Sequence, residues 1–524
     1  MASRPALSTR LPPGAIPWIA ATVACALYAG SVANGFAFDD VRIIEGNTAL
    51  HSLRTVPPML LEPYWRGTGE VYRPLPLLTY AIDWSLSGGA PWLMHTMNVA
   101  WHALMTYLVA RLALRGATAR GALVAGLIFA VHPVHVEAVA NIVGRAELMC
   151  AAMLVGIALV VTNPDERKRR RWGLVALLSA LALASKEIGI AAPAIAWAGS
   201  LAASRSQGES MRALAAAVFG LAPMLVVRYY VLGGLSGIDA HVAFLAVTGV
   251  KQIALALSTY PRVLVMLLIP SVPVPDYSPT LAEVLSPRIG LVALGAMTVV
   301  AALAVVVRHA RTPSFLSFVT LVGVAGFAPV SNLVIRTGVV ISERTLYTAS
   351  VAAAILLAVA FDRIATRARV GIVTCWLAAA AAMTIATVPA WRDSDSVVAL
   401  MRERAPSSYV THVFAAHERR HWGDTAGTRR ELAAALALFD RDARLLTEAA
   451  AEALRAGDAA GARTLLAQAL VVDPANLYAR SMLIELSLSA GDAAAAARLA
   501  REGVELHPDQ RRWRALADSL RQPG

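Results

Sequence analysis

Long apolar runs separated by short polar segments make up the first 390 residues of the chain, and the remainder is mainly polar. A helix that spans a bilayer needs about 20 largely apolar residues. Runs of suitable length predict spanning helices at 16–34, 92–110, 121–138, 146–162, 172–185, 188–203, 213–231, 290–307, 314–331, 346–361 and 370–390. A further apolar run, 251–270, contains Pro261 and ends at Pro270, and we expect these prolines to interrupt it.

The basic residues lie between these runs and predict the topology. They gather at 111–120, 167–171, 205–212, 308–311 and 363–369. Basic loops stay on the cytoplasmic side of a membrane. All five clusters share one side only if 251–270 does not cross. We therefore predict eleven spans, a cytoplasmic N-terminus, an interfacial or re-entrant segment at 251–270, and a C-terminal region on the far side.

Composition agrees with a membrane protein. Hydrophobic residues make up 57% of the chain and the mean hydropathy is +0.57, whereas soluble domains are about 45–50% apolar. The net charge of +12 is explained by the loop clusters, so it does not indicate nucleic-acid binding. The three cysteines, Cys25, Cys150 and Cys375, fall inside apolar runs and predict no disulfide framework.

A 34-residue period appears after the last apolar run. It is marked by Gly423-Asp424, Gly457-Asp458 and Gly491-Asp492, and by Pro474 and Pro508. This is the period of the tetratricopeptide repeat, a helix-turn-helix unit whose stacked copies form a solenoid that can hold peptide. We predict an all-α chain with a membrane domain over 1–390, a linker over 391–408, three repeats over 409–510, and a capping helix and tail over 511–524.

Ionisable residues near the membrane are costly and mark candidate functional sites. With the predicted topology they fall on the outer face, where 35–91 forms the first outer loop. The candidates are Asp39, Asp40, Arg73, His132, His135, Glu137, Arg145, Glu147, Lys186, Glu187, Glu343, Arg344 and Tyr347.

Other roles for these residues remain open. Asp39 and Asp40 could simply end the first span, and Glu343 with Arg344 could form a structural ion pair. The histidines at 132 and 135 could be satisfied by backbone carbonyls. Together with Glu137 they could hold a metal, although this spacing is not a strong ligand pattern.

A second set of polar residues lies on one helical face. His95, Asn98 and His102 stand three and four residues apart, which places them on the same side of a helix. We expect them to form hydrogen bonds between helices.

The order of short motifs resembles the transmembrane and tetratricopeptide-repeat protein O-mannosyltransferases, which belong to the GT-C class. The matching motifs are Asp39-Asp40 to Asn47, Tyr64-Trp65-Arg66-Gly67, Tyr72-Arg73-Pro74-Leu75, His95 to His102, His132 to Glu147, Lys186 to Gly189, and Glu343 to Tyr347. They occur in the family's order along the chain and precede the repeats.

The resemblance implies a membrane glycosyltransferase that moves a sugar, mannose or another hexose, from a polyprenyl-phosphate carrier to Ser or Thr hydroxyls of exported proteins. A carboxylate in the first outer loop serves as the base in this class, which assigns that role to Asp40, with Asp39 second. The remaining candidates would bind carrier and substrate, led by Arg145, Lys186 and Arg344 on the leaving phosphate. No tightly bound cofactor is expected, and no metal is supported.

Two alternatives to this function remain. The chain could be an enzyme of the same class that glycosylates a lipid or a cell-surface glycan, or a non-catalytic scaffold that assembles through its repeats. The excess of Arg over Lys and the abundance of Ala suggest a bacterial chain in the inner membrane with periplasmic repeats. The endoplasmic reticulum membrane is the alternative location.

Overall fold

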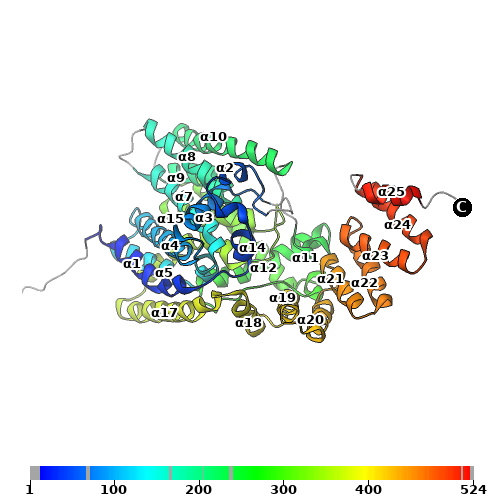
Figure 1. Ribbon diagram of the computed structural model, residues 1–524. Coiled ribbons are helices and arrows are strands. Elements are labelled where there is room, and N and C mark those ends of the chain that lie inside the picture. Colours follow the sequence, from blue (N-terminus) through cyan, green and yellow to red (C-terminus); the bar gives the residue numbers. More distant parts are fainter. Residues whose placement is uncertain are drawn as a thin grey trace, which may run out of the picture. The chain divides into compact units, whose positions relative to one another are not determined.

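The computed structural model describes residues 12–65, 71–163, 168–203, 206–234, 240–508 and 511–519. Every regular element in these ranges is helical, and none is a strand. Two compact units are formed (Figure 1). The first contains Met1–Ala240, Gln252–Pro275 and Arg288–Val397, and the second contains His241–Lys251, Asp276–Pro287 and Val398–Gly524.

Each of the eleven predicted spans coincides with helical structure in the first unit. Short 3₁₀ turns extend many of these helices, as at η1 (Ala29–Ala33), η6 (Glu187–Ala191), η7 (Ala328–Val330), η8 (Glu343–Leu346) and η9 (Val388–Trp391). The helices are α1 (Ile16–Tyr28), α4 (Trp92–Ala113), α5 (Ala119–Val131), α7 (Arg145–Thr162), α8 (Lys168–Ser185), α9 (Ala192–Ala202), α10 (Gln207–Leu232), α14 (Ile289–Arg311), α15 (Phe315–Phe327), α16 (Tyr347–Asp362) and α17 (Thr366–Thr387).

Fewer helices meet the length and composition of a membrane span than the eleven predicted. Six do so within the described ranges: Ile16–Ala33, Ile142–Thr162, Gln207–Leu232, Ile289–Arg311, Glu343–Asp362 and Thr366–Trp391. A seventh is possible if Ala119–Val131 and Pro133–Ala140, which meet at a bend of 50°, count as one span. The second half of this pair is made of η4 (Pro133–His135) and α6 (Val136–Ala140), and η5 (Ile142–Gly144) then leads into α7.

The expectation that prolines interrupt 251–270 is wrong for Pro261. This residue lies inside α12 (Val250–Leu268), which continues past it, whereas Pro270 follows the end of the helix. Proline removes the hydrogen bond to the carbonyl four residues earlier, here that of Leu257. Gly295 of α14 lies against this carbonyl so closely that a Cβ would stand 2.0 Å from its oxygen. The close approach of a glycine thus covers the backbone group that Pro261 leaves free.

Residues 35–91, predicted to form the first outer loop, contribute to a small apolar core. They contain η2 (Val41–Glu45), η3 (Thr48–His51), α2 (Val56–Met59) and α3 (Pro74–Ser87). Buried side chains of these elements, such as Ile44, Leu50 and Tyr80, pack together with Ile142 and Val143 of η5, the turn directly before α7. The loop therefore has a fixed backbone from which functional side chains can be positioned. Arg66 and Gly67 of the Tyr-Trp-Gly motif lie outside the described residues.

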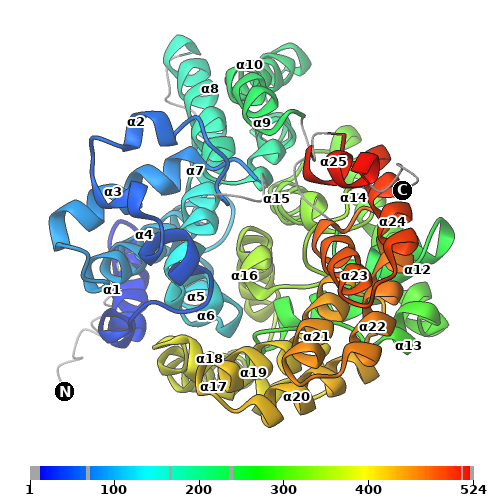
Figure 2. The ribbon, with the colours of Figure 1, turned by 45° about the vertical axis from the view of Figure 1, so that its right-hand side comes forward.

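The predicted repeats form three helix pairs that stack in chain order (Figure 2). They are α19 (Tyr409–His421) with α20 (Thr425–Leu438), α21 (Ala443–Arg455) with α22 (Ala459–Val472), and α23 (Leu477–Ser489) with α24 (Ala493–Leu506), followed by α25 (Arg511–Ser519). The second unit also contains α11 (Val242–Leu245) and α13 (Leu281–Leu285), and α18 (Ser394–Arg404) precedes the repeats. The expected boundaries at residues 390, 408 and 510 stay a prediction.

The Gly-Asp pairs explain the turn inside each repeat. Gly423, Gly457 and Gly491 have φ angles of 75°, 81° and 76°, a left-handed conformation that favours glycine after a helix end. The aspartate that follows each glycine caps the next helix, because its Oδ1 accepts the backbone N–H three residues later at 2.7–2.9 Å. The expected fold class is thereby confirmed: the chain is all-helical, with an apolar helical domain followed by tetratricopeptide repeats.

Candidate active site

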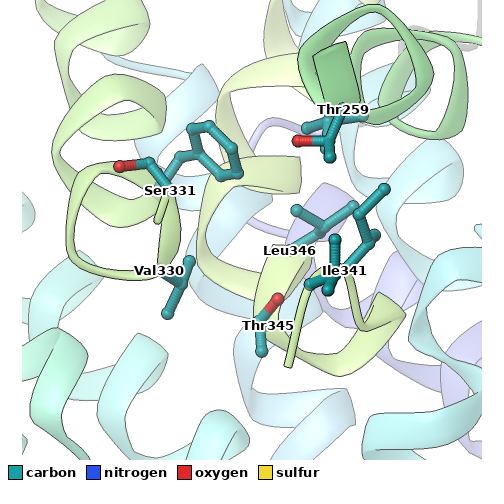
Figure 3. A pocket seen from close by; sticks show the side chains of 9 residues that line it. Thr259, Val330, Ser331, Ile341, Thr345 and Leu346 are labelled. Atoms are coloured by element: carbon teal, nitrogen blue, oxygen red, sulfur yellow. The ribbon is translucent and has the colours of Figure 1, made fainter. Parts of the chain in front are cut away.

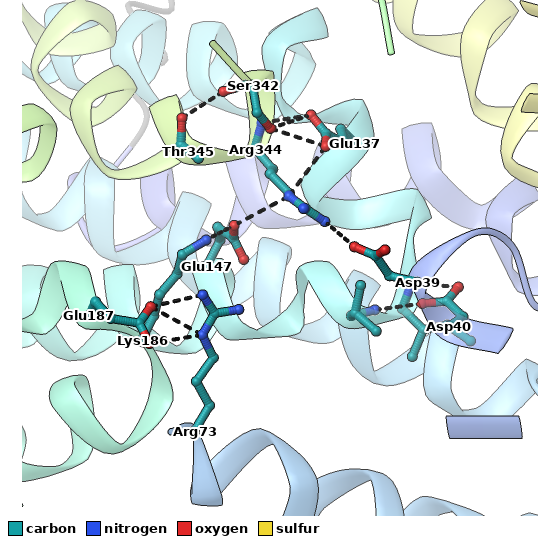
Figure 4. Close-up of polar contacts among 12 residues, drawn as sticks. Asp39, Asp40, Arg73, Glu137, Glu147, Lys186, Glu187, Ser342, Arg344 and Thr345 are labelled. Atoms are coloured by element: carbon teal, nitrogen blue, oxygen red, sulfur yellow. Dashed lines mark hydrogen bonds and ion pairs between the residues drawn. The ribbon is translucent and has the colours of Figure 1, made fainter. Parts of the chain in front are cut away.

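Arg344 is the centre of a group of charged side chains (Figure 4). Its Nη1 donates to Oδ2 of Asp39 at 3.1 Å. Its Nε lies 3.3 Å from Oε1 of Glu137 and 3.9 Å from Oε1 of Glu147. The Arg344 backbone N–H also donates to Glu137 at 3.0 Å, and Ser342 donates its hydroxyl to the same carboxylate. Three carboxylates from separate segments therefore fix one guanidinium.

Lys186 extends this group to a second cation. Its ammonium pairs with Oε1 of Glu147, the same oxygen that faces Arg344. Both members of this pair are buried, and 24% of the Arg344 side chain is exposed. A buried charged side chain is destabilising unless it is paired, and Glu147 contacts two cations.

Arg73 and Glu187 form an adjoining group with a residue that the sequence analysis did not select. Nη2 of Arg73 lies 2.8 Å from Oε2 of Glu187, and Nη1 of Arg228 lies 3.2 Å from Oε1 of the same carboxylate. Arg228 is buried within α10. An arginine inside an apolar run was a signal that the sequence contained, because such residues need a partner.

Asp39 and Asp40 have different environments although they are adjacent. The Asp39 side chain is 29% exposed and contacts Arg344. Asp40 is fully buried, and its carboxylate accepts the backbone N–H groups of Ala37, Ile142 and Val143 at 3.3, 3.2 and 2.8 Å. Asp40 thus fastens the first outer loop to the segment that precedes α7.

Burial raises the pKa of Asp40 to about 7, although the three N–H donors oppose this shift. Such a pKa would suit a general base, but a base must first lie within hydrogen-bond reach of the proton that it accepts. The Asp40 oxygens are enclosed and already accept hydrogen bonds. Asp39 is the member of the pair that a substrate hydroxyl can reach.

Backbone strain occurs beside both groups of charged residues. Phe38, directly before Asp39, has φ +53°, and Val71, two residues before Arg73, has φ +36°. These values are unusual for residues that bear a Cβ, and most of all for a β-branched valine. Strain of this kind often accompanies functional sites. Here it sets the direction in which the backbone presents Asp39 and Arg73.

Arg145 does not join the cations around Arg344. It is fully buried, and its guanidinium is 2.5 Å from Oδ2 of Asp83. The other donors reach Oδ1 of Asn98, the Thr79 hydroxyl and the Met94 carbonyl at 2.9–3.1 Å. All three nitrogens of the guanidinium are engaged, so Arg145 has a structural role in this arrangement.

The histidines and Tyr347 connect helices in the buried interior. Nδ1 of His102 lies 2.8 Å from the Tyr347 hydroxyl, and Nε2 of His135 lies 2.7 Å from that of Ser350. Nε2 of His132 lies 3.2 Å from the Leu267 carbonyl. Hydrogen bonding between helices, expected for the face that bears His102, is confirmed for His102 and for Asn98, which donates to the Val139 carbonyl of α6 at 3.3 Å. His95 instead contacts the carbonyl of Gly35, which lies outside the helices.

Glu137 binds Ser342 and Arg344, whereas His132 and His135 contact other residues. In the described ranges no group of three His, Cys, Asp or Glu side chains is arranged to hold a metal ion. Glu343 is also buried, and its Oε1 accepts the backbone N–H of Val274 at 2.9 Å.

A small cavity lies behind η8, next to the residues that follow Arg344 (Figure 3). It is lined by Thr259, Val263, Phe327, Val330, Ser331, Val340, Ile341, Thr345 and Leu346. None of these side chains is ionisable. The cavity is therefore chemically distinct from the charged group and unsuited to a phosphate.

Comparison with known proteins identifies relatives of this chain. Protein O-mannosyl-transferase TMTC3 of Mus musculus is 33% identical over 181 residues, which cover 32% of this chain and 20% of the relative. Protein O-mannosyl-transferase Tmtc1 of Drosophila melanogaster is 33% identical over 201 residues, covering 36% and 23%. Protein O-mannosyl-transferase TMTC4 of Homo sapiens is 31% identical over 215 residues, which cover 35% of this chain and 29% of the relative. The match thus spans less than a third of each relative.

Two further similarities concern the repeats and the fold. The tetratricopeptide-repeat family matches residues 453–520. Among solved structures, ArnT from Cupriavidus metallidurans bound to undecaprenyl phosphate has a TM-score of 0.40 at 15% identity, over 92% of this chain and 79% of that one. The oligosaccharyltransferase of Archaeoglobus fulgidus tethered with an acceptor peptide has a TM-score of 0.39 at 14% identity, over 75% of this chain and 57% of that one. These scores are too low to inform the function.

The sequence similarity confirms the resemblance that the motifs indicated. The chain is a homologue of the transmembrane and tetratricopeptide-repeat protein O-mannosyl-transferases, matched over about a third of its length.

Proposed function

We propose that this protein is a membrane glycosyltransferase that moves a sugar, mannose or another hexose, from a polyprenyl-phosphate carrier to Ser or Thr hydroxyls of exported proteins. The observation that carries the proposal is the partly exposed group in which Asp39 contacts Arg344, beside Lys186 and Glu147. It combines a carboxylate that can accept a proton with cations that can bind a phosphate. Homology to protein O-mannosyl-transferases supports the reaction class.

In this proposal Asp39 is the base. A Ser or Thr hydroxyl is a weak nucleophile, and a carboxylate within hydrogen-bond reach accepts its proton as the oxygen attacks the anomeric carbon. Attack opposite the carrier inverts that carbon. Asp40, which the resemblance placed first, instead holds the loop that presents Asp39, because its own oxygens are buried and occupied.

Arg344 and Lys186 would stabilise the departing polyprenyl phosphate. A phosphate is a stable leaving group and needs cations where its charge increases, not a general acid. Nε and Nη1 of Arg344 face carboxylates, whereas its Nη2 has no partner in the part of the chain that the structure describes. This edge can donate to a phosphate oxygen, with the planar geometry that arginine provides.

The repeats would hold the acceptor protein. Stacked helix pairs present an extended concave surface that accommodates peptide, and three such pairs are present here. The alternative is that the repeats bind a partner subunit. We further propose a bacterial inner membrane location with periplasmic repeats, and an endoplasmic reticulum membrane as the alternative.

The test is to incubate membranes that contain the chain with a polyprenyl phosphate bearing a radiolabelled hexose. The proposal expects label on exported proteins, at Ser or Thr residues located by mass spectrometry, and none with Asp39→Asn. Label on lipid or glycan alone would favour the second enzyme class. Absence of all transfer, with the chain folded and the donor intact, would refute the proposal and favour the scaffold.

A further inference from the structure

The proton transfer and phosphate departure proposed above leave the Arg73–Glu187–Arg228 triplet without a role. Its members come from three segments: Arg73 precedes α3, Glu187 begins η6, and Arg228 lies in α10. Glu187 accepts Nε and Nη2 of Arg73 at 3.1 and 2.8 Å through Oε2, and Nη1 of Arg228 at 3.2 Å through Oε1. One carboxylate is thus held from two directions by planar cations.

The triplet is not sealed off from the active site. The side chains of Arg73 and Glu187 are 17% and 18% exposed. The Arg73 guanidinium lies over the Tyr64 ring, and its hydrogen bonds to Glu187 use Nε and Nη2, so Nη1 has no hydrogen-bond partner among the residues that the structure describes. Oε2 of Glu187 accepts two hydrogen bonds, whereas Oε1 receives only Nη1 of Arg228 at 3.2 Å and the longer branch of the shared Nε contact at 3.3 Å, so Oε1 is the oxygen that can accept from a ligand. An open donor therefore lies beside an open acceptor.

Chain connectivity places this pair next to the proposed phosphate site. Glu187 directly follows Lys186, which contacts Glu147 beside Arg344. Figure 4 shows Arg73 and Arg344 extending toward each other from opposite sides of the group. A sugar attached to a phosphate on Arg344 would lie close to Glu187 and Arg73.

The chemistry of the pair selects the kind of group that it can bind. A cation would be repelled by the two arginines, and a phosphate that reached Nη1 of Arg73 would have to lie beside the Glu187 carboxylate, which opposes its binding. Neighbouring hydroxyls are neutral, and each both donates and accepts. One hydroxyl can donate to Glu187 while the next accepts from Nη1 of Arg73.

We propose that Glu187 and Arg73 form a subsite for neighbouring hydroxyls of the donor sugar, and that Arg228 is the residue that positions Glu187. This inference rests on the function proposed above and specifies which part of the donor the site recognises. Because a carboxylate between two guanidinium groups stays ionised, Glu187 acts as a fixed acceptor and not as a second base. Arg228 is buried and acts on the sugar only through Glu187.

The experiment combines Glu187→Gln with donors that each lack one ring hydroxyl. With the complete sugar, Glu187→Gln should lower kcat/KM by about tenfold to a hundredfold, the effect of a hydrogen bond to a charged group. For the unaltered chain, one of the deoxy donors should lower kcat/KM by a similar factor. For Glu187→Gln the same donor should lower kcat/KM little further, because the substitution and the missing hydroxyl remove the same hydrogen bond. Glu403→Gln, on an exposed carboxylate of α18 paired with Arg404, is the matched control.

The role of Arg228 has its own readout. Arg228→Gln should reproduce the donor dependence of Glu187→Gln, and Arg228→Lys should restore part of the discrimination. If Glu187→Gln does not fold, Arg73→Lys replaces it, because lysine keeps the charge and loses the planar fork. If every deoxy donor lowered kcat/KM by the same factor in Glu187→Gln as in the unaltered chain, the inference would be overturned. Transfer of hexose to protein by the unaltered chain would still support the proposed function. Failure of the unaltered chain to transfer any hexose to protein would instead refute the function.

Discussion

Replacement of Asp39 by Asn should remove catalysis and leave the fold intact. The amide keeps the size of the side chain and cannot accept a proton, and loss of a general base costs on the order of 10²–10⁴ in rate. The structural cost should be small. Asp39 is partly exposed, and among the described residues it forms an ion pair with Arg344 at 3.1 Å; pairs that solvent reaches contribute about 1 kcal/mol.

The adjacent substitution Asp40→Asn should have the opposite effect. Three backbone N–H groups point at the buried carboxylate, and an amide offers them one oxygen and places its NH₂ against the others. Each buried donor left without an acceptor costs about 1–3 kcal/mol. Asp40→Asn should therefore lower the thermal unfolding midpoint, yet retain more activity per folded molecule than Asp39→Asn.

Two measurements on the purified chain in detergent separate these outcomes. Transfer from a polyprenyl-phosphate hexose to a Ser-containing protein gives the rate, and the loss of monodisperse protein on heating gives the stability. Near-normal transfer by Asp39→Asn would refute its assignment as the base. A folded and stable Asp40→Asn that has lost all transfer would return the role of base to Asp40.

Four other outcomes test the remaining assignments. Arg344→Ala should lower turnover strongly at saturating donor, and lysine should restore only part of it because an ammonium cannot face Asp39, Glu137 and a phosphate at once as the planar guanidinium does; normal turnover would move the phosphate site elsewhere. Arg145→Met should lower the free energy of unfolding by about 3–5 kcal/mol, and with it the yield of folded protein, because it leaves the Asp83 carboxylate buried without its partner. A well-folded variant with a raised KM for the donor would contradict this. Gly457→Ala should destabilise the second repeat by about 1–2 kcal/mol, since its φ is 81°, measured by hydrogen exchange of α21 and α22 in the full chain. A reporter fused after Gly524 should be active only outside the cytoplasm, and cytoplasmic activity would overturn the predicted topology.

Local features of the sequence determined the secondary structure and the repeats. An apolar run of sufficient length forms a helix whichever neighbours surround it, and all eleven runs are helical. A glycine followed by an aspartate encodes a left-handed turn and a helix cap within a few residues, so Gly457 and Asp458 specify their turn alone. The number of membrane spans is less well determined by sequence: eleven were predicted, whereas helix length and composition support six or seven in the described residues.

The sequence also brought most of the candidate residues to light, since charge near a membrane is rare enough to be informative. Asp39, Glu137, Glu147, Lys186 and Arg344 do meet in one group. Their motifs lie far apart along the chain, and the predicted topology together with the order of these motifs suggested that they belong together.

Tertiary structure alone decided what each charged residue does. Asp39 and Asp40 are the same residue type at adjacent positions, and they differ because backbone N–H groups more than 100 residues away enclose one of them. Arg145 resembles a phosphate ligand in sequence, yet Asp83 and its neighbours engage it in the interior. Whether a charge is held by the fold or left for a substrate depends on burial and on partners from distant segments. Neither quantity is encoded in the local sequence.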